Sequence, residues 1–372
     1  MIDYFLYTCK TIHLILIIKI YYPIKPFIYT ILNIGMYDGY GMEALQMKIL
    51  LVNVDSKFNL AIRRMFNYFS KDNEVEMKDL KLNGYPNKKK VTIVNAAGFD
   101  RVYVSNIFEI NQKRFKVVGC DDIIYGGIGS TNSLSKLPKE IEETEPFYHP
   151  HEDTSYGFIT RGCIRNCFFC KVPKHEGMLR FYNSIDSIVK HTKVKFLDNN
   201  ILAYNKHLEV FQYLIDHNIK CEFNQGLDFR LINEENAKLL SQLNYIRDYK
   251  FAFDDVKYQP LLEKQLKIIK KYISSEWKLK FYVYQNKDMD IPSLIHRIEW
   301  CRKNKALPYL MRDANCWESE EKNFYIDYAA YCNQPTFFKT IDFKTFLIKR
   351  YPKNRERIEE CLKIYNDNCK NI

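Results

Sequence analysis

The stretch YGFITRGCIRNCFFCKVPKHEG, which runs from Tyr156 to Gly177, decides what kind of fold the chain can have. It begins as an apolar strand pattern and continues directly into three cysteines, Cys163, Cys167 and Cys170. No fourth cysteine completes the group. Three thiolates with one open position suit either a zinc ion whose fourth ligand is distant in sequence or an iron–sulfur cluster with one iron left free.

The spacing of possible ligands distinguishes these two kinds of site. Structural zinc usually takes two separated pairs of cysteine or histidine, and the chain has no second pair of this kind. The other cysteines are scattered singly, which indicates free thiols in a reducing, cytoplasmic compartment. His149 and His151 lie just before the strand pattern, where two solvent-facing loop histidines are a simpler interpretation than a metal site.

The sequence after Tyr156 alternates strand patterns with helical periodicity. The six strand candidates are 156–160, 194–198, 220–224, 249–254, 279–284 and 307–311. Helical patterns separate them, and Asn233 can cap one of these helices. This alternation predicts a partial (β/α)6 barrel of the TIM type over residues 150–315. The cysteines would then lie at the carboxyl ends of its strands, where such folds carry their sites.

Residues 47–145 carry a different set of short apolar runs. The run KILLVNV (48–54) precedes a helical stretch over 60–69. Further strand candidates follow at 74–77, 91–96, 101–105 and 115–120. The pattern predicts a small Rossmann-like α/β domain with a parallel sheet. Gly126 and Gly127 follow its last strand, and such a pair permits either the close approach of a ligand or a tight turn.

The first 46 residues differ in composition from the rest of the chain. Lysines and prolines interrupt their apolar run, so no uncharged stretch reaches the roughly 20 residues that a spanning helix needs, and no membrane partner is expected. The codons of Met42–Ala44 can contain a ribosome-binding sequence shortly before Met47. A misassigned start is therefore the preferred interpretation of residues 1–46, and a disordered extension is the alternative.

Composition adds little about partners. A formal charge of +11 with 28 Tyr and 25 Phe would suit nucleic acid, through phosphate attraction and base stacking. A chain rich in Lys, Asn, Ile and Tyr also follows from an AT-rich coding sequence, so the charge is weak support for this partner. At the carboxyl end, residues 316–372 show the apolar spacing of an amphipathic helical tail that packs on the preceding domain.

The motif C-x-x-x-C-x-x-C resembles that of the radical S-adenosylmethionine (radical SAM) superfamily. Phe169 precedes the third cysteine, and the motif follows the first strand of a six-unit β/α pattern, over roughly residues 150 to 315. The resemblance implies that Cys163, Cys167 and Cys170 hold a [4Fe–4S] cluster whose fourth iron binds S-adenosylmethionine. Reductive cleavage would yield a 5′-deoxyadenosyl radical that abstracts hydrogen from an unidentified substrate. A reductant such as flavodoxin or ferredoxin is the implied partner.

The same resemblance implies an S-adenosylmethionine site at the strand ends. The candidate residues are Phe169, Asp198, Asn199, Asn200, Gln225, Gly226, Asp228 and Arg230. The aromatic ring would lie against the nucleoside, and the three residues that end the second strand would face the amino group of the methionine moiety. For the two aspartates, a helix cap or a turn is the alternative role. Asp254 and Asp255, after the fourth strand, are weaker candidates.

Two alternatives to this function remain open. Pro173 and Gly177 stand at offsets after the cysteines that recur in methylthiotransferases, so methyl or methylthio transfer to RNA or another macromolecule is one. That family carries further cysteines for a second cluster, whereas here Cys120 stands alone before the motif, so a second cluster is not expected. The other is a protein without enzymatic activity, which uses its metal for electron transfer or for structure.

The amino-terminal domain is similar to the cobalamin-binding domains that precede many radical SAM barrels. The similarity rests on Asp55 after the first strand, Ser105 in the run VSNI, and the glycine pair described above. Cobalamin domains with an axial histidine carry D-x-H-x-x-G in the first loop, but Lys57 and Leu60 occupy the histidine and glycine positions here. A vestigial domain is therefore preferred to one that binds cobalamin.

Overall fold

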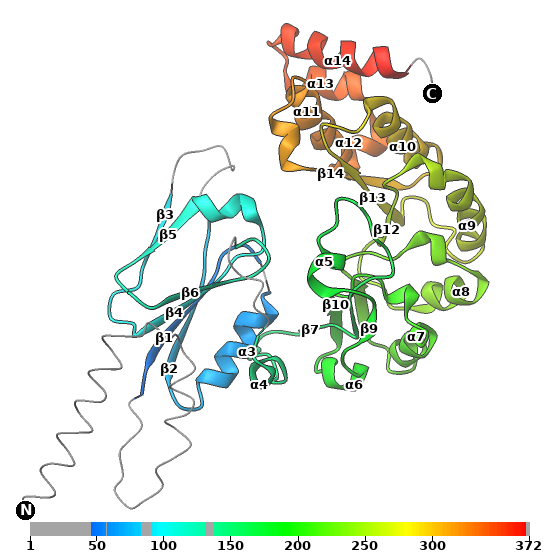
Figure 1. Cartoon of the computed structure of the whole chain (residues 1–372). Helices are drawn as coiled ribbons and strands as arrows, with labels where there is room; N and C mark the ends of the chain where they lie inside the picture. The colour runs from blue at the N-terminus through cyan, green and yellow to red at the C-terminus, as the bar shows by residue number, and fades with distance from the viewer. Residues whose placement is uncertain (1–45, 57, 83–90, 131–136, 370–372) are drawn as a thin grey trace, which may run out of the picture. The chain divides into compact units, whose positions relative to one another are not determined.

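The computed structural model describes residues 46–56, 58–82, 91–130 and 137–369. The expectations for residues 1–45 and for Lys57 lie outside these ranges. The chain is a mixed α/β protein whose main sheets are parallel (Figure 1). Across the described ranges, no helix combines the length and the apolarity that crossing a membrane requires.

The first sheet has the strand order β2-β1-β4-β6, and all of its pairs are parallel. Its strands are β1 (Lys48–Asn53), β2 (Glu74–Asp79), β4 (Arg101–Ser105) and β6 (Ile123–Gly126). The central strand β1 is buried along nearly its whole length because both of its faces are covered. Successive side chains alternate between these two faces.

Different layers cover the two faces of this sheet. On one face, α3 (Leu60–Phe69) and α4 (Lys139–Glu142) pack on the β1 side chains of Ile49 and Leu51. On the other face, a parallel pair of strands, β3 (Thr92–Asn95) and β5 (Phe115–Val118), supplies the apolar partners. A Rossmann-like domain predicts crossover helices on both faces, and here strands take the place of helices on the second face.

In the second half of the chain, β7 (Thr154–Gly157), β10 (Lys193–Phe196) and β11 (Lys220–Phe223) form a parallel sheet in the order β11-β10-β7. A second parallel sheet has the order β12-β13-β14. Its strands are β12 (Tyr249–Ala252), β13 (Leu279–Gln285) and β14 (Leu307–Arg312). Isolated parallel bridges, Cys221 to Tyr245 and Leu227 to Phe251, link the neighbourhoods of β11 and β12. The strands therefore follow one another in chain order.

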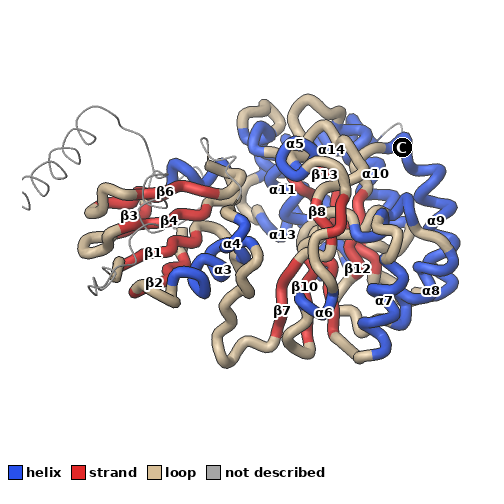
Figure 2. Tube along the Cα trace, turned by 60° about the horizontal axis from the view of Figure 1, so that its bottom comes forward, coloured by secondary structure: helices blue, strands red, loops and turns tan. Residues whose placement is uncertain are grey.

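The helices that connect these strands are α7 (His207–Asp216), α8 (Glu234–Gln242), α9 (Gln259–Tyr272) and α10 (Ile291–Lys303). Figure 2 shows α7, α8 and α9 side by side along one side of the strands. Helix residues such as Phe211 and Leu266 meet strand residues such as Phe223 and Phe251 in one apolar core. The amphipathic periods of the sequence therefore place their apolar sides against a single face of the strands.

Short elements surround the cysteines, and they are β8 (Thr160–Arg161), α5 (Val172–Glu176), β9 (Arg180–Phe181) and α6 (Ile185–Ile188). The strand expected over 156–160 is interrupted, because β7 ends at Gly157 and β8 begins at Thr160. Short 3-10 helices follow several strands, namely Glu109–Arg114, Ile201–Ala203, Phe229–Leu231, Val256–Tyr258 and Ala314–Trp317.

The carboxyl-terminal tail is a group of helices. Its helices are α11 (Lys322–Cys332), α12 (Pro335–Thr340), α13 (Phe343–Arg350) and α14 (Arg355–Cys369). Pro335 occupies the first turn of α12, and Asp342 caps α13 by accepting from the Thr345 amide at 2.7 Å. Together these helices bury Val283 of β13 and Leu310 of β14, so the tail packs on the second sheet.

Candidate functional site around the cysteine loop

The three cysteines lie on a loop between β8 and β9, which we call the cysteine loop (residues 162–179). Strands β8 and β9 pair antiparallel and bring the two ends of the loop together. The Cys163 amide donates to the Gly177 carbonyl at 3.2 Å, and the Cys170 amide donates to the Cys167 carbonyl at 3.0 Å. All three thiols are free and partly exposed. The loop therefore presents three sulfur atoms in one short, internally bonded segment.

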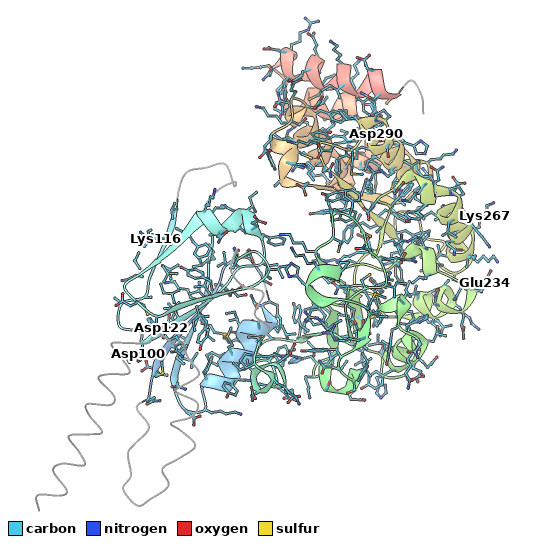
Figure 3. All side chains as sticks on the ribbon, viewed as in Figure 1. Asp100, Lys116, Asp122, Glu234, Lys267 and Asp290 are labelled. Atoms are coloured by element: carbon cyan, nitrogen blue, oxygen red, sulfur yellow. The ribbon has the colours of Figure 1, made fainter. Side chains whose placement is uncertain are left out.

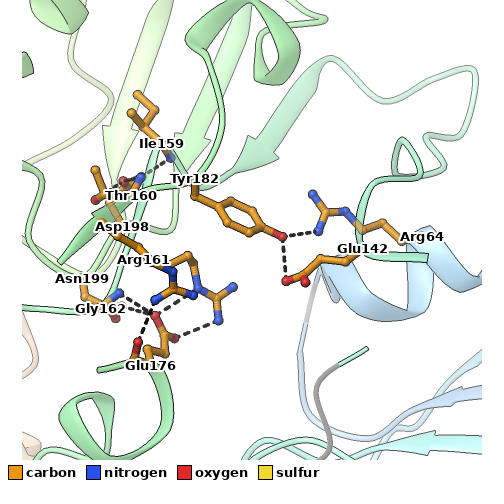
Figure 4. Close-up of polar contacts among 11 residues, drawn as sticks. Arg64, Glu142, Ile159, Thr160, Arg161, Gly162, Glu176, Tyr182, Asp198 and Asn199 are labelled. Carbon is orange, nitrogen blue, oxygen red and sulfur yellow. Dashed lines mark hydrogen bonds and ion pairs between the residues drawn. The ribbon is translucent and has the colours of Figure 1, made fainter. Parts of the chain in front are cut away.

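Glu176 closes the base of the cysteine loop (Figure 4). Its carboxylate accepts two hydrogen bonds from the Arg161 guanidinium, both at 3.0 Å, and one from the Gly162 amide at 2.9 Å. The Asn199 amide donates to it at 2.8 Å. Asn199, a candidate from the sequence, thus contacts the cysteine loop through Glu176. Glu176 itself was not among the candidates from the sequence. A single carboxylate in a loop otherwise rich in Arg and Lys was the available signal.

Gly162 permits a close approach of two backbone segments at the start of the loop. Its φ of +81° is in the left-handed region, and an added Cβ would lie 2.2 Å from the Met178 carbonyl oxygen. Gly177, at the other end, has a φ of +75° but would have no atom within 4 Å of an added Cβ. A substitution at either glycine therefore has the cost of a positive φ, whereas only a substitution at Gly162 has the added cost of a steric clash.

We expect Gly162→Ala to destabilise the protein more than Gly177→Ala does. Both changes force alanine into a backbone conformation with positive φ, which costs about 1–3 kcal/mol, and the ψ of −152° at Gly177 belongs to a region that essentially only glycine adopts. The Gly162 variant must in addition displace the backbone at Met178, so its total cost should exceed that of the Gly177 variant by at least about 2 kcal/mol. Urea denaturation of both variants measures the difference. Equal losses of unfolding free energy in the two variants would show that the backbone at Met178 moves away from residue 162 without cost.

Asp198 holds the end of β7 rather than facing open space. Its carboxylate accepts from the amides of Ile159 at 3.2 Å and Thr160 at 2.5 Å, and from the Thr160 hydroxyl at 2.8 Å. These bonds divert two amides from the strand ladder, which explains why the expected strand over 156–160 is interrupted. The side chain is almost fully buried, and this burial raises the pKa of Asp198 to about 6. Its predicted contact with the methionine amino group stays a prediction.

The raised pKa of Asp198 gives a pH-dependent stability. In the unfolded chain an aspartate loses its proton near pH 4, whereas in the folded chain Asp198 keeps it until about pH 6. The folded state thus binds more protons in this window, and stability from this group falls as pH rises through it. We expect the unfolding free energy of the wild type, relative to Asp198→Asn, to fall by about 2 kcal/mol between pH 4 and pH 6.

Urea denaturation at a series of pH values tests this expectation. Asp216→Asn, which removes an exposed carboxylate on α7, is the matched control and should follow the wild type throughout. If Asp198→Asn retains the full pH dependence of the wild type, the proton is held elsewhere.

A polar network borders Cys163. The Cys163 sulfur accepts from the Arg165 amide at 3.3 Å and from Asn200 Nδ2 at 3.8 Å. The Asp228 carboxylate accepts from the same Asn200 nitrogen at 3.3 Å and from Arg165 Nε at 2.8 Å. Arg230 Nε donates to the other oxygen of Asp228 at 2.6 Å. The structure thus brings Asn200, Asp228 and Arg230, all candidates from the sequence, to the first cysteine.

This network holds two guanidinium groups against one carboxylate, which leaves one positive charge in excess, and one of its acceptors has no partner. Burial alone would raise the pKa of Asp228, but Arg230 and Arg165 outweigh it and lower that pKa, so the group stays a carboxylate. Asn200 is 2% exposed, and its Oδ1 atom is buried without a hydrogen-bond partner. A buried amide oxygen without a donor is costly, so this atom is suited to a donor brought by a bound group.

Phe169 lies on an aromatic ring from the end of β13. Its ring stacks on that of Tyr284 with centroids 4.0 Å apart and an interplanar angle of 13°. The Tyr284 amide donates to Asp254 Oδ1 at 2.9 Å, and the hydroxyl donates to Asp313 Oδ2 at 2.8 Å. Tyr284 ends the fifth expected strand, so the rule that sites lie at carboxyl ends could have identified it. Asp254, a weaker candidate in the sequence, supports this ring.

Gln225 and Gly226 take different places in the turn after β11. Gln225 is exposed, whereas Gly226 is buried with a φ of +93°. An added Cβ at Gly226 would lie 3.4 Å from the Lys250 carbonyl and 3.5 Å from the Tyr282 ring. Protein atoms therefore fill the space beside this glycine.

Asp55 and Ser105, two residues of the cobalamin-like similarity, have hydrogen-bond partners within the protein. The Asp55 carboxylate accepts from the amides of Ile107 at 3.1 Å and Phe108 at 2.9 Å. The Ser105 hydroxyl accepts from Asn59 Nδ2 at 2.8 Å. These bonds join the loops that follow β1 and β4.

The glycine pair after β6 serves backbone packing. Gly127 has a φ of +88°, and an added Cβ would lie 2.3 Å from the Asn106 carbonyl oxygen. Of the two roles left open by the sequence, a tight turn against protein backbone is the one that the structure shows for Gly127.

The thiols of the cysteine loop are close enough to influence one another. Burial raises the pKa of Cys167 and Cys170, and the neighbouring thiols contribute in the same direction. In the part of the chain that the structure describes, no group of three or more His, Cys, Asp or Glu side chains is arranged to hold a metal ion. No protein-family model and no curated protein sequence matches this chain.

Proposed function

We propose that this chain is a radical SAM enzyme in which Cys163, Cys167 and Cys170 hold a [4Fe–4S] cluster. The observation that carries the proposal is the position of three free thiols on one loop at the carboxyl ends of parallel strands, bordered by the network of Asn200 and Asp228. The strands β7 and β10–β14 follow one another in chain order with helices between them, which supports a partial (β/α)6 barrel. A Rossmann-like domain would precede it.

The thiols fit a cluster in their chemistry. They are free and partly exposed, and a metal site needs both properties for its ligands to be reached. A [4Fe–4S] cluster is larger than one metal ion, so its cysteine ligands lie further apart than the ligands of a single ion. The described residues contain no group of side chains arranged around a single ion, which agrees with this wider spacing. The raised pKa values of Cys167 and Cys170 mean that these thiols would release protons on binding metal, so uptake should be favoured at higher pH.

Residues beside Cys163 fit the cosubstrate. The unpartnered Oδ1 of Asn200 can accept from an ammonium group, and the Asp228 carboxylate holds this side chain in place by accepting from Asn200 Nδ2. Phe169 and Tyr284 provide an aromatic surface for a nucleoside. When bound, the cluster would supply the electron that cleaves S-adenosylmethionine, and the 5′-deoxyadenosyl radical would abstract hydrogen from substrate. The protein's part is to orient the cosubstrate and to exclude water.

The proposal includes no cobalamin. Asp55 accepts from the amides of Ile107 and Phe108, Ser105 accepts from Asn59, and Gly127 packs on the Asn106 backbone. All three features that suggested a corrin site thus have partners within the protein. A reducing cytoplasm with a flavodoxin or ferredoxin as electron donor suits a protein with free thiols.

Anaerobic reconstitution of the full chain with iron and sulfide tests the function. We expect about four iron and four sulfide per chain, as a [4Fe–4S] cluster requires. Reduction in the presence of S-adenosylmethionine should then yield 5′-deoxyadenosine and methionine. A cluster that forms but cleaves no cosubstrate would favour electron transfer, and zinc in place of iron would favour a structural site.

A further inference from the structure

The strands of the second half have one face that is not covered by α7–α9, and its side chains are polar. This polar face consists of Tyr156, Lys195, Glu222, Lys250, Tyr282 and Tyr309. In β13 the alternation is strict, since Phe281 and Val283 are buried while Tyr282 between them is partly exposed. Closed barrels fill such positions mainly with branched apolar residues. The polar face is therefore suited to contact with a ligand rather than to packing.

Charge on the polar face is uneven. Lys195 pairs with Glu222 at 3.4 Å, and Lys250 contacts the other oxygen of the same carboxylate. Burial would raise the pKa of Glu222, but Lys250 and Lys195 outweigh it and lower that pKa, so the group is ionised. Two lysines share one carboxylate, which leaves one positive charge in excess. The Lys195 side chain is 30% exposed, so a ligand can reach this charge.

Aromatic rings adjoin this charge. Tyr282 and Tyr309 are register partners on β13 and β14, and their ring centroids are 5.6 Å apart. Tyr309 is 42% exposed. Ala252, the partner of Tyr282 on β12, is exposed as well, and its small side chain leaves space beside the rings. An exposed ring next to open space can stack on a planar group.

We propose that the polar face binds the substrate of the enzyme, and that this substrate carries an anionic group and a planar ring, as a nucleotide does. This inference rests on the proposed function only in calling the ligand a substrate. The binding of the ligand does not depend on that function. Lys195 would meet the anionic group and Tyr309 the ring. Tyr282 and Tyr284 are two residues apart on β13, about 7 Å along the strand. Because Tyr284 stacks on Phe169, the polar face leads directly to the cysteine loop.

Calorimetric titration of the full chain with 5′-nucleoside monophosphates, and with the nucleosides that lack the phosphate, tests the proposal. We expect the monophosphates to bind about tenfold more tightly at low salt, and the difference to shrink as salt is raised. Lys195→Gln should weaken monophosphate binding about tenfold. Glu222→Gln should strengthen it several-fold, because it raises the excess charge from one to two. Neither variant should change nucleoside binding.

Opposite signs from two neighbouring residues cannot come from a general loss of structure. Lys267→Gln removes an exposed lysine on the outer side of α9 (Figure 3) and should leave binding unchanged. Tyr309→Ala should weaken monophosphates and nucleosides alike, by about tenfold. The proposal is overturned if monophosphates do not bind or if Lys195→Gln and Glu222→Gln change binding in the same direction.

Two further measurements identify the kind of ligand and test whether its binding depends on the cluster. A short single-stranded oligonucleotide that binds more tightly than the monophosphates would place the nucleotide unit within a nucleic acid, and weaker binding would identify a free nucleotide. Titration of the Cys163→Ala chain, which cannot hold the cluster, should give the same affinities as the wild type. Failure of the radical SAM function would therefore leave this binding intact, and failure of binding would leave the cluster intact.

Discussion

Alanine at Cys163, Cys167 or Cys170 is expected to abolish the visible iron–sulfur absorbance of the reconstituted protein, and with it the cleavage of S-adenosylmethionine. Each thiolate would be one of three protein ligands, and the loop offers no substitute within its short span. The expected effect is complete because both the cofactor and its chemistry depend on the same three atoms. Absorption spectra, iron and sulfide content, and 5′-deoxyadenosine formation measure it.

Cys120→Ala is the matched control, since Cys120 is also a free and partly exposed thiol but lies in the first domain. Its thiol donates to the Asp122 carbonyl, and it is not one of the three proposed ligands, so cluster content and cleavage should be unchanged. A triple variant of the loop cysteines that retains a full cluster would contradict the proposal. Loss of the cluster in Cys120→Ala as well would show that it depends on thiols outside the loop.

The sequence was a good guide where a pattern is local and repeats. The helical patterns at 207–218, 233–243, 258–273 and 291–304 correspond to α7, α8, α9 and α10. Asn233 caps α8 as expected, by accepting from the Asn236 amide. These features depend on side chains three or four residues apart, which a single stretch of sequence displays.

Features that depend on distant residues were missed or only partly predicted. The interruption of the first strand depends on the carboxylate of Asp198, some 40 residues later, and the pattern YGFIT contains no trace of it. The second layer of the first domain likewise depends on β3 pairing with β5 across an intervening strand.

The helical tail has a local signal that shows where its helices begin. Pro335 and Asp342 each begin a new helix, and both residues are visible in the sequence.

Some residues of the candidate site could be predicted from the sequence, and others could not. Asn200, Asp228 and Arg230 were named because they follow strands, and parallel strands bring their ends together. Glu176 was missed although it is the single carboxylate of the cysteine loop, because its partners lie in β8 and after β10. The excess charge of the polar face results from one carboxylate between two strands, so composition alone cannot reveal it.

Asp327→Ala is expected to destabilise the protein by about 3 kcal/mol, because it removes the anion from a buried ion pair. Asp327 on α11 is fully buried and accepts from Arg357 Nε of α14 at 2.7 Å and from the Tyr351 hydroxyl at 2.7 Å. Arg350 of α13 lies 3.2 Å from the same carboxylate. Loss of the carboxylate leaves Arg357, whose side chain is only 15% exposed, with the more distant Glu360 carboxylate at 4.0 Å as its ion-pair partner.

Glu356→Ala is the matched control, since Glu356 is an exposed carboxylate in the first turn of α14. It should cost no more than about 0.5 kcal/mol, because a surface charge near a helix start contributes little. Urea denaturation compares the two variants. A loss for Asp327→Ala no larger than that for Glu356→Ala would show that the apolar contacts of α11–α14 hold these helices without the ion pair. The larger loss would instead make Asp327 the residue that joins α11, α13 and α14 to one another.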